Sequence, residues 1–179
     1  MERSRRNFLA GTARLAGLAV LAGLPGACGF KPLYGGGQDA GTAAGLSQVK
    51  IVPIADRSGQ LLYNDLRERM NPKGVPGDPQ YILTVDLTEL QEDILFASDE
   101  TPTRTNVVQR AEYMLTRTLD DQVVLTGVSQ VTTGYNILEN EFASLNSELD
   151  AQRRGLGQIA YEIATRLAVF MSEQNAAQP

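Results

Sequence analysis

The residues of this sequence that most closely resemble a catalytic pair are three carboxylates near residue 90. Glu89, Glu92 and Asp93 cluster near the end of a predicted strand, and two carboxylates so placed can act as the acid and the base that cleave a glycosidic bond. A sugar site of that kind usually has an aromatic platform, and the chain contains no Trp. We therefore interpret these carboxylates as side chains of a solvated turn.

The composition excludes most other catalytic centres. The chain has no His and one Cys, which excludes a His-based triad, a His general base and most metal and redox sites. No glycine-rich phosphate loop and no nucleophile–base pair is apparent in the sequence. The sequence therefore predicts a protein that is not an enzyme and that uses no cofactor or metal.

Three arginines could bind an anionic group. Arg104 and Arg110 fall on one face of a predicted strand, and Arg117 falls on the other face near a turn. Guanidinium groups bind phosphate through two parallel hydrogen bonds. The alternative is a solvated sheet face on which Arg110 pairs with Glu112, a pairing worth only ~0–1 kcal/mol when exposed.

The only cysteine, Cys28, follows a segment with the features of an export signal. Arg5 and Arg6, with Ser before them and Phe-Leu after them, resemble a twin-arginine signal. The apolar run that follows has about ten residues, whereas a helix needs ~20 to cross a bilayer. We therefore expect residues 1–27 to be a signal peptide that is removed.

The residues just before Cys28 indicate what happens to its thiol. Gly26 and Ala27 resemble a lipobox, in which lipid is joined to the cysteine and cleavage makes that cysteine the N-terminus. Gly29 is not the Asp that retains some lipoproteins in the inner membrane, which leaves the outer membrane open as the destination. The alternative is a soluble exported protein with a free thiol, which an oxidising compartment disfavours.

Length and net charge restrict the domain organisation and the binding partners of the rest of the chain. The 179 residues carry a net charge of -5, and because residues 1–27 carry +3, the remainder carries -8. A body this acidic is a poor general binder of nucleic acid or of anionic lipid surfaces. We expect a lipidated N-terminus and flexible Gly-rich tether over 28–46, one domain over 47–174, and a disordered tail over 175–179.

The hydrophobic pattern predicts six elements in this domain. A short strand covers 49–54, and a helix covers 59–70 with Ser58 as its N-cap. Alternating residues then predict strands over 81–91, 103–119 and 123–135. The inward side chains of the second of these are Val107, Ala111, Tyr113, Leu115 and Leu119.

The last element is a long amphipathic helix over about 145–173, in which Gly155 and Gly157 would permit close approach to the sheet. The element order β-α-β-β-β-α therefore predicts an α+β fold. In it, two helices pack on one face of a four-stranded, mostly antiparallel sheet, and the other face stays polar and open.

Two motifs resemble a known family. The run Cys-Gly-Phe-Lys-Pro-Leu-Tyr-Gly over 28–35 and the Asp-Arg-Ser-Gly helix entry over 56–59, with the element order, resemble the LptE family of lipopolysaccharide-assembly lipoproteins in its alphaproteobacterial form. The resemblance implies a non-catalytic plug inside the outer-membrane barrel LptD that supports lipopolysaccharide delivery. It also implies lipopolysaccharide contacts through basic residues near strand ends, for which Arg104, Arg110 and Arg117 are the candidates.

A second role is compatible with the same features. A periplasmic lipoprotein that serves as a binding accessory of an inner-membrane lipid ABC transporter would share the anchor, the size and the sheet. Co-purification distinguishes the two roles, because each predicts a different membrane partner.

Overall fold

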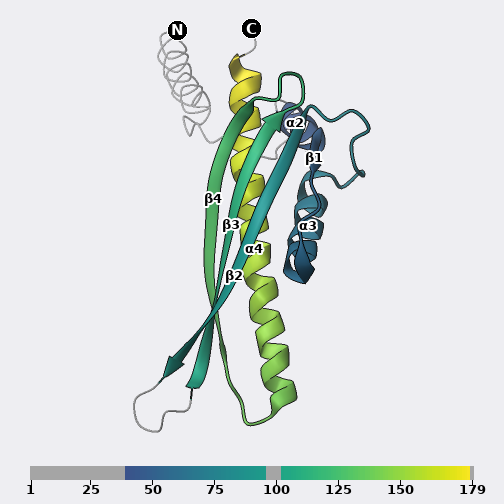
Figure 1. The fold of residues 1–179 in the computed structure, drawn as a ribbon. Helices are drawn as coiled ribbons and strands as arrows, with labels where there is room; N and C mark the ends of the chain where they lie inside the picture. Colours follow the sequence, from purple (N-terminus) through teal and green to yellow (C-terminus); the bar gives the residue numbers. More distant parts are fainter. Residues whose placement is uncertain (1–38, 96–101, 178–179) are drawn as a thin grey trace, which may run out of the picture. The chain divides into compact units, whose positions relative to one another are not determined.

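The computed structural model describes residues 39–95 and 102–177, so Arg5, Arg6 and Cys28 lie outside the described residues. The elements, shown in Figure 1, are α2 (Asp39–Ser47), β1 (Val49–Ile51), α3 (Asp56–Met70), β2 (Tyr81–Leu95), β3 (Pro102–Arg117), β4 (Val123–Asn136) and α4 (Glu141–Ala177). The predicted α+β fold with a four-stranded sheet is confirmed.

The four strands lie in sequence order across the sheet. β1 runs parallel to the first residues of β2, while β2, β3 and β4 form an antiparallel meander. The register places Ala111 of β3 opposite Leu87 of β2 and Ser129 of β4. Because strand side chains alternate between faces, these three residues share one face of the sheet.

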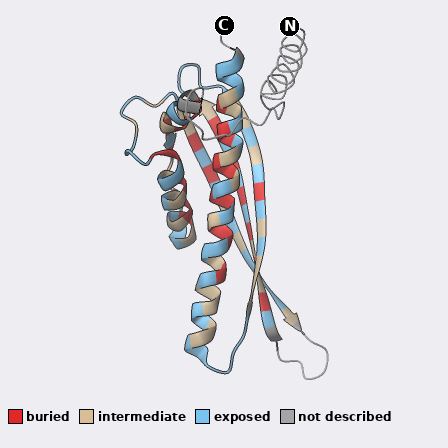
Figure 2. Ribbon diagram, turned by 180° about the vertical axis from the view of Figure 1, so that it is seen from behind, coloured by how far each residue is buried: buried red, intermediate tan, exposed pale blue. Residues whose placement is uncertain are grey.

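The helices α3 and α4 cover that same face, as the two opposite views in Figures 1 and 2 show. The apolar stripes of both helices meet the inward side chains of β2 and β3 in one core. Its fully buried members include Leu62, Leu66, Leu83, Leu115, Leu156, Ile159, Ile163 and Leu167. Figure 2 shows that the first turns of α4 are exposed or partly exposed, so the core lies against its middle and C-terminal part.

The expected flexible tether is wrong for residues 39–46, which form most of α2. Leu46 is 3% exposed, and the Cα of Gly45 lies so close to α4 that an added Cβ would be 3.3 Å from Met171 Cγ. Small residues allow this close packing as readily as they allow flexibility, which the composition alone does not reveal. At the other end α4 continues to Ala177, so 175–177 are helical rather than a tail.

The boundaries of two elements also differ from the prediction. Ser58 is not the N-cap of α3, because the helix begins at Asp56 with Ala55 in the cap position. The early start brings Gly59 against Ile54, where an added Cβ would be 2.7 Å from the Ile54 Cγ2. Leu119, predicted to point inward, lies beyond the end of β3 and is 90% exposed.

Candidate functional site

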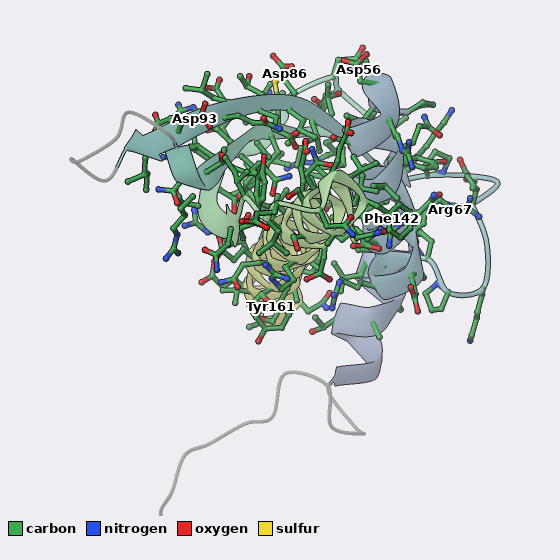
Figure 3. The ribbon with its side chains drawn as sticks, turned by 90° about the horizontal axis from the view of Figure 1, so that it is seen from below. Asp56, Arg67, Asp86, Asp93, Phe142 and Tyr161 are labelled. Carbon is green, nitrogen blue, oxygen red and sulfur yellow. The ribbon has the colours of Figure 1, made fainter. Side chains whose placement is uncertain are left out.

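The sheet face opposite the helices is not covered by any described element. Figure 3 shows Asp86 on this outer face, pointing away from α4, whereas Tyr161 lies on the far side of α4 from the sheet. A shallow hollow on the outer face is lined by Asp86, Glu112, Met114 and Val128. The predicted open sheet face is therefore present, and it carries both charged and apolar side chains.

The structure does not bring the three candidate arginines together. Arg104 and Arg110 share the outer face but are six residues apart on β3, which is about 20 Å along a strand. Arg117 lies at the opposite end of β3 and pairs with Asp120, with 3.3 Å between Nη1 and Oδ2. The Arg110 Nη2 lies 2.8 Å from Glu112 Oε1, which is the ion pair that the sequence suggested.

Arg104 differs from the other two arginines. Its guanidinium crosses β4 at Gly134, where an added Cβ would be 2.7 Å from Nη2. Within residues 39–95 and 102–177 it forms no ion pair. Of the three, Arg104 therefore has the guanidinium that is most available to an anionic group.

The predicted cluster of carboxylates is divided between the two sheet faces. Glu92 lies opposite Asn106 with its side chain on the outer face, whereas Glu89 and Asp93 point to the helix side. Asp93 accepts a hydrogen bond from Thr105 Oγ1 at 2.7 Å. The interpretation of a turn is wrong, because β2 continues to Leu95; Glu89 and Asp93 accept hydrogen bonds, whereas Glu92 is exposed on the strand.

Glu89 belongs to a polar network that the sequence analysis missed. Its two carboxylate oxygens accept hydrogen bonds from Gln109 Nε2 at 2.8 Å and from Gln152 Nε2 at 3.0 Å. Gln109 is fully buried and also donates to the Gln152 backbone C=O at 3.3 Å. The network fixes α4 to the sheet where the apolar core ends. A glutamine among the inward residues of β3 was the available signal.

An apolar patch was also missed, because the last helix was expected to begin at residue 145. The patch comprises Ile137, Leu138, Phe142 and Leu145, at the end of β4 and the start of α4, and Phe142 is 74% exposed. Large exposed apolar side chains that are close in the sequence, as these are, are typical of contacts with a partner.

Residues 39–95 and 102–177 contain no group of three His, Cys, Asp or Glu side chains placed to hold a metal ion. No helix among these residues is both long enough and apolar enough to span a bilayer.

No family model matches the sequence, and no curated protein is similar to it. The fold is similar to that of a candidate lipoprotein from Caulobacter crescentus CB15, with 21% identity, a TM-score of 0.64, and coverage of 75% of this chain and 97% of that one.

Two further solved structures share the fold. Rare lipoprotein B from Shewanella oneidensis has 11% identity and a TM-score of 0.57, with coverage of 70% of this chain and 97% of that one. A minor lipoprotein from Acinetobacter baumannii has 13% identity and a TM-score of 0.55, with coverage of 69% of this chain and 92% of that one. At these identities the likeness shows a common fold.

Proposed function

We propose that this protein is an outer-membrane lipoprotein that serves as plug and assembly partner of an LptD-type β-barrel and so supports lipopolysaccharide transport to the outer leaflet. One combination of observations carries the proposal. The predicted export signal and Cys28 precede a domain whose fold is shared with solved proteins that are named as lipoproteins.

The surfaces of the domain suit a role in assembly. The helices cover one sheet face, and the other face remains available for contact. The patch around Phe142 offers apolar contacts at one end of the domain. We propose that the Arg104 guanidinium contacts a phosphate of lipopolysaccharide, since the other two candidate arginines are engaged by Glu112 and Asp120.

The membrane anchor can be tested by labelling cells with an alkyne fatty acid and separating inner from outer membranes. The wild-type chain should carry the label and fractionate with the outer membrane, and Cys28→Ala should be unlabelled and released from it. Label on Cys28→Ala would overturn the proposed anchor. Wild-type protein in the inner membrane would favour the role of an ABC-transporter accessory.

A further inference from the structure

The outer edge of β4 is open along the whole strand. β4 is the last strand of the sheet and has 14 residues. Figures 1 and 2 show no described element beyond its outer edge. Within residues 39–95 and 102–177, the backbone of β4 forms backbone hydrogen bonds only with β3 and the adjoining turn.

The alternation of backbone bonds identifies the groups at this edge. The Arg117 N–H donates to the Gln122 C=O at 2.8 Å. Because backbone groups alternate in direction along a strand, the N–H and C=O groups of the odd-numbered β3 residues point toward β4. The N–H and C=O groups of their partners on β4, such as Ser129, point toward β3. The intervening residues therefore present N–H and C=O groups at the free edge: Thr126, Val128, Gln130 and Thr132.

The other open edge of the sheet, along β2, is protected against pairing with a further strand, whereas the edge of β4 is not. β1 pairs only with Tyr81–Leu83, which leaves the rest of β2 as an edge. That edge carries four carboxylates: Asp86, Glu89, Glu92 and Asp93. β4 has no charged residue and no Pro between Val123 and Asn136. Natural sheets discourage edge pairing with charge or proline, so an edge without either is suited to pairing with another strand.

The charges at the two ends of β4 distinguish between occupants. Asp120 and Asp121 precede the strand, and Glu139 and Glu141 follow it. A second copy of the chain, paired antiparallel, would bring carboxylates against carboxylates at both ends. We infer that the β4 edge binds an extended, uncharged segment of another protein, with Lys or Arg at its ends, as an added strand. Neither the barrel nor lipopolysaccharide enters this inference, so it stands apart from the proposed function.

A synthetic peptide can serve as the probe. Its centre would be five Thr-Val repeats, with two lysines at each end, and its binding to the purified full chain would be followed by fluorescence anisotropy. The lysine-ended peptide should bind more tightly than a glutamate-ended one. A version with every amide N-methylated should not bind, because it cannot donate hydrogen bonds. Equal binding of the methylated peptide would overturn the inference.

The matched variants are Gln130→Pro and Gln130→Ala. The proline removes an N–H at the free edge without removing a bond to β3, whereas the alanine changes only an exposed side chain. The proline should weaken peptide binding roughly tenfold or more, and the alanine should leave it unchanged. Equal binding by wild type and Gln130→Pro would contradict the assignment.

Hydrogen exchange provides a readout that does not depend on a variant. The peptide should slow exchange at the amides that face the free edge, which are those of Thr126, Val128, Gln130 and Thr132. Slowed exchange only along residues 84–95 would place the peptide on the edge of β2 and would overturn the inference. Sedimentation of the free chain as a dimer joined through β4 would assign the edge to a second copy instead, and would also overturn the inference.

Discussion

At the scale of single residues, a tyrosine covers a glycine across two strands. Tyr113 of β3 lies opposite Gly127 of β4, and a Cβ added at the glycine would overlap the tyrosine ring. The ring supplies contacts that a glycine in a strand otherwise lacks. The Tyr113 hydroxyl is buried without a hydrogen-bond partner among the described residues.

This arrangement predicts opposite results for two substitutions. Gly127→Ala should lower the free energy of unfolding by about 1–3 kcal/mol, because the tyrosine ring must move. Tyr113→Phe should leave stability equal or higher, because it removes a buried hydroxyl that has no partner. Urea denaturation monitored by circular dichroism measures both changes. A loss of stability in Tyr113→Phe would show that the hydroxyl has a partner in solution.

Asp65 makes stability depend on pH. Burial raises the pKa of its carboxyl above the ordinary value of 3.8, and the Arg69 guanidinium partly offsets the rise. A raised folded-state pKa favours the native state below the unfolded value, and this contribution is lost as pH rises through the folded value. Asp65→Asn should therefore be more stable than wild type at pH 7 and equal to it at pH 3. Equal stability at both pH values would contradict this account.

At the scale of elements, two glycines of α4 have different roles. An added Cβ at Gly155 would overlap Gln109 Oε1 on the sheet, whereas one at Gly157 would meet Asp65 Oδ2 only at an ordinary 3.7 Å. Gly155→Ala should lower the free energy of unfolding by about 1–3 kcal/mol, because Gln109 must move away from Glu89. Gly157→Ala should raise it by up to about 1 kcal/mol through helix propensity.

Chemical denaturation of the two alanine variants, measured side by side, tests this difference. The two substitutions are identical in chemistry and lie two residues apart, so each serves as the control for the other. Similar losses of stability at both positions would mean that α4 packs as tightly against Asp65 of α3 at Gly157 as it packs against the sheet at Gly155.

Local pattern predicts the faces of these elements better than their ends. Alternation correctly assigned Val107, Ala111, Tyr113 and Leu115 of β3 to the inward face, because strand side chains have a period of two. It ended β2 too early, because Glu89 and Asp93 look like turn residues until their partners are known. Those partners, Gln109 and Gln152 among them, come from distant segments. A single sequence does not show such pairings.

At the scale of the whole molecule, the fold and the candidate site differ in how much the sequence could predict. The amphipathic patterns were sufficient for two helices on one face of a four-stranded sheet. The three arginines could be placed on their strand but not in relation to a ligand. Alternation along a strand predicts the sheet face on which a side chain lies, but it does not predict which groups lie beside it. The patch around Phe142 depends on where α4 begins, which the pattern placed too late.

We propose that a large outer-membrane β-barrel protein is the partner of this chain. The most direct test is affinity purification of the full chain, tagged at its C-terminus, from detergent-solubilised outer membranes, with an untagged strain as control. We expect one large outer-membrane β-barrel protein to be recovered with the tagged chain in a ratio near one to one. Recovery of ABC-transporter subunits in place of a barrel, or of no barrel above the untagged control, would contradict it.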